Sequence, residues 1–138
     1  MTEKALNILL VEDDNVDVMN VKRAFEKNRI ANPLFVASNG IDALTMLRSG
    51  NVPGERRIVL LDLNMPRMNG LEFLRELRAD PGLHSTVVIV LTTSNDERDK
   101  VDAYNLNVAG YLLKPVTFIN FVELMAALNK YWTLVELP

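Results

Sequence analysis

Five short apolar runs, each followed by an amphipathic stretch, constrain the fold of this chain more than any other feature. The runs occupy residues 6–11, 34–37, 58–61, 87–91 and 110–113. Nearly continuous Val, Ile and Leu runs of this length are typical of parallel strands that are covered on both faces. The stretches between them place apolar residues at helical spacing, as Leu71, Leu74 and Leu77 do.

Turn and cap residues support the same division into strands and helices. Asn69-Gly70 and Asn95-Asp96 are suited to begin helices, and Asp80-Pro81-Gly82 is suited to end one. Asn107 falls where a helix end often needs a left-handed residue. Five strand–helix units joined by right-handed crossovers predict an α/β fold, a doubly wound five-stranded parallel sheet of order 2-1-3-4-5, as in flavodoxin-like proteins.

Length and composition favour one globular domain. The 138 residues fit a single core, so we expect a domain over residues 1–131 and a C-terminal apolar tail over 132–138. The chain has no cysteine, which excludes disulfides and thiolate metal sites, and its one histidine, His84, is expected on a surface loop. With a net charge of −3 and no dense basic run, nucleic-acid binding is not expected. No stretch is long and apolar enough for a membrane span, and the start lacks a signal-peptide pattern, so a cytoplasmic location is expected.

Polar residues follow four of the five predicted strands directly. The segments are Glu12-Asp13-Asp14, Asp62-Leu63-Asn64, Thr92-Thr93-Ser94 and Lys114-Pro115. Ligands of doubly wound sheets bind outside the carboxyl ends of the strands, where these segments converge. We therefore expect acids, hydroxyls and one amine to meet at this edge.

The charges expected at this edge predict a metal site. Glu12, Asp13 and Asp62 would repel one another at close range, and a hard divalent cation such as Mg²⁺ relieves that repulsion. Their three negative charges are balanced by Lys114 and one Mg²⁺. A neutral pocket of this kind is suited to receive a phosphoryl group, whose transfer depends on positioning and charge neutralisation.

The order and spacing of these residues resemble the CheY-like receiver domains of response regulators, the phospho-accepting switches of two-component signalling. The resemblance covers roughly residues 7–130. Its marks are Glu12-Asp13, Asp62, Met65-Pro66, Asn69-Gly70, Thr92-Thr93, Tyr111 and Lys114-Pro115.

The resemblance implies a role for each residue of the site. Asp62 would accept the phosphoryl group from a sensor histidine kinase, and Lys114 would contact a phosphoryl oxygen. Asp13 would bind Mg²⁺ directly, Glu12 would act nearby or through water, and the backbone carbonyl of Asn64 would be a further ligand.

The resemblance also implies a conformational switch. Thr92 would move its hydroxyl toward the new phosphate, and Tyr111 would follow into the space that it leaves. The added phosphate gives one state hydrogen bonds that the other lacks. In the family the bond between Lys114 and Pro115 is cis, which suits an X-Pro bond at a functional turn.

Simpler interpretations remain for each residue. The first acids can cap the following helix, and Asp14 is read in that way. Asp62 can be a turn residue and Lys114 a surface lysine. Thr92 can be an ordinary strand residue, and Tyr111 a core residue. Thr93 stands where the family prefers small side chains, and a threonine there can restrict the access of water to the phosphorylation site.

Three other functions fit parts of the sequence. A haloacid-dehalogenase-type phosphohydrolase also forms an aspartyl-phosphate, but it typically has a second Asp where this chain has Asn64. A flavodoxin-like cofactor binder needs a hydroxyl- and glycine-rich phosphate loop instead of Glu12-Asp13-Asp14. A receiver that has lost phosphorylation would serve only as a scaffold.

The expected output is altered protein binding rather than turnover of a substrate, since the receiver occupies the whole chain. The helix over about 15–28 is the expected docking face for the kinase. The tail from Tyr131 to Pro138 resembles stand-alone regulators paired with bacterial phytochromes, so a phytochrome kinase is a candidate partner. A homodimer is expected through the helix between Asn95 and Asn107, the strand 110–113, the last helix and the tail. The alternative is that the tail folds back on its own domain.

Overall fold

The computed structural model describes residues 6–54 and 56–138, in which strands and helices alternate. The first five residues of the expected domain, and Glu55 in the loop before the third strand, lie outside the described residues. The elements are β1 (Asn7–Val11), α1 (Asn15–Lys27), β2 (Leu34–Ala37), α2 (Gly40–Arg48), β3 (Arg57–Leu61), α3 (Gly70–Ala79), β4 (Val87–Thr92), α4 (Glu97–Asn105), β5 (Gly110–Leu113) and α5 (Phe118–Leu134). All strand pairs are parallel and the order is β2-β1-β3-β4-β5, which confirms the predicted topology.

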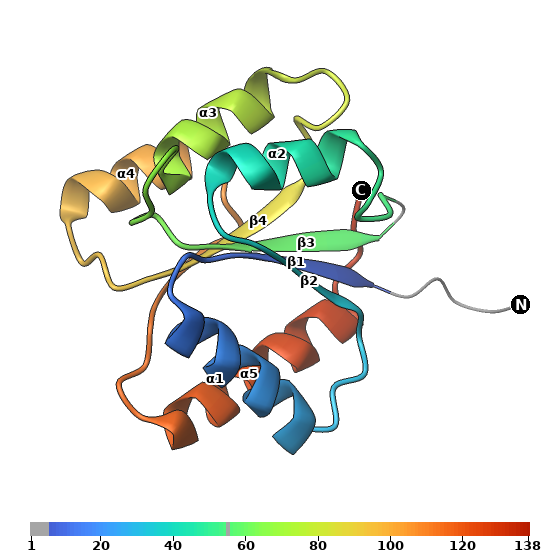
Figure 1. The fold of residues 1–138 in the computed structure, drawn as a ribbon, viewed down its shortest axis with the longest axis vertical. Helices are drawn as coiled ribbons and strands as arrows, with labels where there is room; N and C mark the ends of the chain where they lie inside the picture. Colours follow the sequence, from blue (N-terminus) through green and yellow to red (C-terminus); the bar gives the residue numbers. More distant parts are fainter. Residues whose placement is uncertain (1–5, 55) are drawn as a thin grey trace, which may run out of the picture.

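Helices cover both faces of the sheet, as continuous apolar strands require. Figure 1 shows α1 and α5 on one face and α2, α3 and α4 on the other. Alternate residues of β1 divide between the two resulting cores: Leu9 and Val11 pack on the α2–α3 side, and Ile8 and Leu10 on the α1–α5 side. Strand β1 is therefore fully buried, and β3 and β4 are buried beyond their first residues, so their carboxyl ends are held in fixed positions.

The helix ends follow the predicted cap residues. Asn69 forms a capping box with Glu72, and Asp96 accepts N–H hydrogen bonds in the first turn of α4. Asp14 caps α1 in the same way, which confirms its simpler interpretation. Asn107 has a φ of 62°, the left-handed conformation expected after α4.

The last helix is longer than the sequence suggested. Helix α5 continues to Leu134, so the first three residues of the expected tail are helical. Trp132 is 1% exposed and lies against Phe25, with ring centroids 6.1 Å apart. Val135 and Leu137 pack against the same core. The tail thus folds back onto its own domain, because its apolar side chains complete the α1–α5 core, while Leu134 stays exposed.

None of the helices in the described ranges combines the length and the hydropathy that crossing a bilayer demands.

Candidate functional site

Three acids meet at the carboxyl edge of the two central strands. Val11 and Leu61 are paired in register, so Glu12 and Asp62 leave the sheet side by side. Each of Glu12, Asp13 and Asp62 offers a carboxylate oxygen, and these oxygens lie within 4.8 Å of one another. Glu12 and Asp62 are buried, whereas Asp13 is exposed. The predicted acid cluster is therefore present.

Lys114, directly after β5, places its ammonium among carboxylates. Its Nζ lies 2.6 Å from Glu12 Oε2 and 3.3 Å from Asp62 Oδ2. A third carboxylate, Asp17 Oδ2 on α1, lies 2.8 Å away. Asp17 could not be predicted as a site residue, because it follows no strand and has the position of an ordinary first-turn acid. With Asp17 included, four acids, Lys114 and one divalent cation carry a net charge of −1 rather than zero when all the acids are ionised.

The burial of this cluster shifts its protonation. Burial raises the pKa of Glu12 to about 7; the hydrogen bond from Lys114 opposes the rise and the charge of Asp62 adds to it. Burial alone would lower the pKa of Lys114, but the hydrogen bonds to Asp17 and Glu12 outweigh burial and raise it. The ammonium therefore stays charged, while Glu12 holds a proton more readily than an exposed glutamate does.

Hydrogen bonds fix the orientation of the Asp62 carboxylate. Thr92 donates from Oγ1 to Asp62 Oδ1 at 2.7 Å, and the backbone N–H of Asn64 donates to the same oxygen at 3.3 Å. Oδ2 faces Lys114. Asp62 is thus held from both sides.

Thr92 and Tyr111, the predicted switch pair, are connected through Ser94. The N–H of Ser94 donates to Thr92 Oγ1 at 3.3 Å, and the hydroxyl of Tyr111 donates to the Ser94 carbonyl at 2.8 Å. Ser94 Oγ donates to Asp99 on α4 at 2.6 Å. Burial raises the pKa of the Tyr111 hydroxyl, which keeps it a donor. The sequence placed Ser94 at the end of a strand but did not indicate that it links Thr92 to Tyr111, because that link depends on two backbone contacts.

The loop from Asp62 to Asn69 is held tightly between the strand and two helices. Gly70 lies so close to the strand end that a Cβ there would be 2.5 Å from the Asp62 carbonyl oxygen. Met68 has a φ of 142°, and its carbonyl accepts the N–H of Gly40 at the start of α2. This packing fixes the backbone from which the Asp62 carboxylate extends.

The donor chemistry of the cluster fits a hard divalent cation. Its ligand atoms are carboxylate oxygens, the type that Mg²⁺ prefers, and the exposed Asp13 leaves access for water ligands. Asn64 is exposed beside the cluster, and the role of its carbonyl as a ligand stays a prediction.

One expectation carried by the family resemblance is wrong. No peptide bond among the described residues is cis, so the bond between Lys114 and Pro115 is trans. The Lys114 N–H nevertheless donates to the Thr92 carbonyl at 2.8 Å, which extends the β4–β5 pairing to the site.

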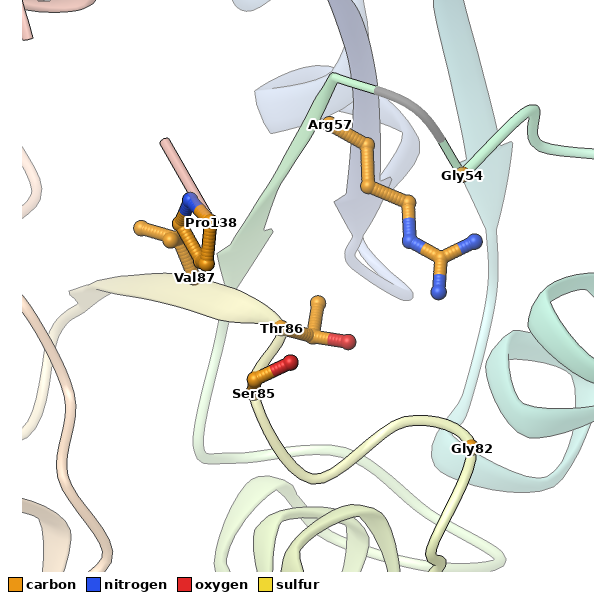
Figure 2. Close-up of a pocket in the computed structure, with 7 residues that line it drawn as sticks. All are labelled: Gly54, Arg57, Gly82, Ser85, Thr86, Val87 and Pro138. Carbon is orange, nitrogen blue, oxygen red and sulfur yellow. The ribbon is translucent and has the colours of Figure 1, made fainter. Parts of the chain in front are cut away.

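A small pocket elsewhere on the molecule is unrelated to this site. Arg57, Thr86 and Val87 line it at the amino ends of β3 and β4, beside Pro138 (Figure 2). Arg57 donates to the Val52 carbonyl there. The pocket lies at the opposite end of the strands from Asp62.

The doubly wound sheet thus carries clustered acids, a hydroxyl and an amine at the carboxyl edge of its strands, the arrangement expected of a receiver domain. The model of the response regulator receiver domain matches residues 8–129. This chain therefore belongs to the response regulator receiver family.

Similar proteins come from archaea and cyanobacteria. FilR2 of Methanothrix harundinacea (strain 6Ac), named "Probable methanogenesis regulatory protein", is 36% identical over 127 residues, covering 91% of this chain and 82% of that protein. Response regulator Rcp1 of Synechocystis sp. (strain ATCC 27184 / PCC 6803 / Kazusa) is 33% identical over 128 residues, covering 91% and 87%.

Solved structures of the same group share the fold. The Mn²⁺-bound form of Rcp1 has a TM-score of 0.83 at 32% identity and covers 98% of this chain and 99% of that one. The phosphorylated cyanobacterial phytochrome response regulator RcpA has a TM-score of 0.86 at 29% identity with the same coverage. The structural neighbours thus include stand-alone phytochrome response regulators.

Proposed function

We propose that this chain is a single-domain response regulator that accepts a phosphoryl group on Asp62 from a sensor histidine kinase, in a Mg²⁺-dependent reaction. One observation carries the proposal: the Asp62 carboxylate belongs to an acid cluster whose oxygens could hold a cation, and it accepts hydrogen bonds from Thr92 and Lys114. It is a switch rather than an enzyme with a separate substrate.

The chain's own groups account for the transfer. A carboxylate oxygen of Asp62 attacks phosphorus, an O–P bond forms, and the N–P bond to the kinase imidazole breaks with its electron pair passing to nitrogen. Thr92 and Asn64 hold the carboxylate in place. Lys114 offers an ammonium to the phosphoryl oxygens. Asp13 and Asp62, with Glu12 and the Asn64 carbonyl, would hold Mg²⁺, which would supply charge neutralisation.

The link through Ser94 supports the predicted Thr92–Tyr111 switch. If the Thr92 hydroxyl turns to the phosphate, it breaks its hydrogen bond to Asp62, and Oγ1 moves relative to the Ser94 N–H. Ser94 in turn holds Tyr111 and Asp99, so the change reaches α4. The signal would leave the molecule as altered protein binding on the α4–β5–α5 side.

Exposed apolar residues beside the site support a docking face for the kinase. Val16 on α1 is 68% exposed and Val116, after β5, is 98% exposed. Each lies within two residues of the Asp17–Lys114 contact, which places both close to the site along the chain. The likeness to Rcp1 and RcpA favours a phytochrome kinase as the partner.

A homodimer through α4, β5 and α5 is the second interaction that we propose. Val101, Tyr104 and Leu113 are exposed on α4 and β5, and Leu134 is exposed at the end of α5. Light scattering with and without beryllium fluoride tests it: a monomer in both conditions contradicts it.

Intact-mass analysis after incubation with acetyl phosphate and Mg²⁺ tests the proposed function. We expect wild type to gain the mass of one phosphoryl group, and Asp62→Asn or Mg²⁺-free protein to gain none. Equal labelling of Asp62→Asn would contradict the proposal.

A further inference from the structure

Asp17 is the one carboxylate of the cluster that the proposed phosphoryl transfer does not use. It lies in the first turn of α1, where an acid ordinarily favours the helix dipole. That role requires no contact with another element. Yet Asp17 Oδ2 lies 2.8 Å from Lys114 Nζ, closer than Asp62 Oδ2 at 3.3 Å.

The contact with Asp17 leaves Lys114 without a spare donor. An ammonium has three N–H groups. Three carboxylates face the Lys114 ammonium, from Glu12, Asp17 and Asp62. The lysine side chain is only 6% exposed, so water has little room to exchange with these partners. A phosphoryl oxygen can bind the ammonium only if one carboxylate releases it.

Exposure indicates which carboxylate is released. The Asp17 side chain is 21% exposed, whereas those of Glu12 and Asp62 are 2% and 4% exposed. Water can solvate Asp17 once it loses the ammonium, but an unpaired buried carboxylate is costly. Asp17 is therefore the partner that can leave at the lowest cost.

We propose that Asp17 is a positioning residue that holds Lys114 in the unphosphorylated protein and competes with the phosphoryl group for its ammonium. The inference rests on the proposed function. Asp17 would stabilise the unphosphorylated state relative to the phosphorylated state. It would therefore set how readily the protein changes from one state to the other. Its removal frees one donor and takes one negative charge from a pocket that must receive an anion.

Asp17→Asn tests the competition with little change in shape. Beryllium fluoride, an anionic mimic of the phosphoryl group, is titrated at saturating Mg²⁺ and followed by fluorine NMR. We expect about five- to tenfold tighter binding than in wild type, because a competing charge is gone. Mg²⁺ alone should bind more weakly, because the cluster is less negative. A merely loosened site would weaken both.

Two controls isolate the contact with Lys114. Glu26→Gln makes the same charge change at an exposed position of the same helix and should alter neither affinity by more than about twofold. In a Lys114→Gln background, Asp17→Asn should change beryllium fluoride binding much less than in wild type. In metal-free protein, the Nζ–H signal of Lys114 should exchange with water faster in Asp17→Asn.

The outcomes separate this inference from the proposed function. Unchanged or weaker beryllium fluoride binding in both Asp17→Asn and Asp17→Ala, while wild type is phosphorylated, overturns the role of Asp17 alone. An equal effect of Asp17→Asn with and without Lys114 overturns it too. If wild type takes neither beryllium fluoride nor phosphate, the proposed function itself is wrong, and this inference with it.

Discussion

Burial and ion pairing shift the pKa of Glu12 in opposite directions. Its Oε2 lies 2.6 Å from the Lys114 ammonium, and Asp14 N–H donates to Oε1 at 3.1 Å. Both contacts favour the charged form, but burial next to Asp62 outweighs them. The side chain therefore changes charge near neutral pH, where a divalent cation competes with the proton.

This competition predicts a pH-dependent affinity for Mg²⁺. Since the pKa of Glu12 is about 7, the apparent affinity for Mg²⁺ should increase with pH. The increase should reach about tenfold for each pH unit up to pH 7, and the affinity should then level off. Calorimetric Mg²⁺ titrations between pH 5.5 and 8.5, about three units, measure it. Glu12→Gln should remove most of the slope, and an equal slope in that variant would contradict the assignment.

The raised pKa of Glu12 also predicts the direction in which the stability of the metal-free protein changes with pH. The raised pKa means that the folded protein binds more protons than the unfolded chain between about pH 4.5 and 7. The contribution of Glu12 to the free energy of unfolding should therefore fall as pH rises through this window. Urea denaturation of wild type and Glu12→Gln in chelator checks it: the difference between the two proteins should change with pH in that direction.

Thr92 supplies the buried hydroxyl that orients Asp62. Thr92→Val keeps the shape but removes the 2.7 Å hydrogen bond, so unfolding should become easier by about 1–2 kcal/mol. Urea denaturation measures the change. Thr93→Val, the same substitution at the exposed neighbouring residue, should stay within about 0.5 kcal/mol of wild type. Equal effects at both positions would show that the hydrogen bond contributes nothing.

At the scale of elements, the close contact between α3 and the end of β3 fixes the loop from Asp62 to Asn69. A Cβ on Gly70 would lie 2.5 Å from the Asp62 carbonyl oxygen and 2.7 Å from the Leu63 Cα, and neither backbone atom can move freely. Gly70→Ala should therefore cost about 2 kcal/mol or more and displace Asp62.

Gly110→Ala is the matched control for this substitution. The nearest atom to its Cβ is a methyl carbon of Ile89 at 3.9 Å, an ordinary contact. Unfolding curves and Mg²⁺ affinity should change in Gly70→Ala and not in Gly110→Ala. A Gly70→Ala protein with wild-type stability and Mg²⁺ affinity would contradict the proposed role of the contact.

Arg78 joins α3 to two loops at the far end of the sheet. Its guanidinium donates to the carbonyls of His84, Thr86, Leu106 and Asn107 at 2.7 to 3.1 Å. Arg78→Met leaves these carbonyls without that donor and should lower the free energy of unfolding by about 2–3 kcal/mol. Arg75→Met, at an exposed position on the same helix, should change it little. Urea denaturation of both variants measures the two changes in the free energy of unfolding.

At the scale of the whole molecule, the sequence predicted what depends on local pattern. The strand order followed from apolar runs and crossover handedness, and the caps at Asn69 and Asp96 followed from residue type. The site residues could be named because parallel strands must end at the same edge.

The remaining features depend on tertiary contacts that no local pattern carries. The contacts of Asp17 and Arg78 with distant elements arise from packing, and the sequence shows only a first-turn acid and a last-turn base. The fate of the tail was left open, since an apolar segment can pack on its own core or on a partner. The burial of Trp132 against Phe25 shows that the tail packs on the core of its own domain.

Trapping the phosphorylated residue chemically is the most direct test of the central claim. Borohydride reduces an acyl phosphate to an alcohol, so treatment after incubation with acetyl phosphate and Mg²⁺ marks the acceptor for peptide mapping by mass spectrometry. We expect the mark on Asp62, and no mark when Mg²⁺ is removed by chelator. A mark on Asp13 or another acid, or none under any condition, would contradict the assignment of Asp62 as phospho-acceptor.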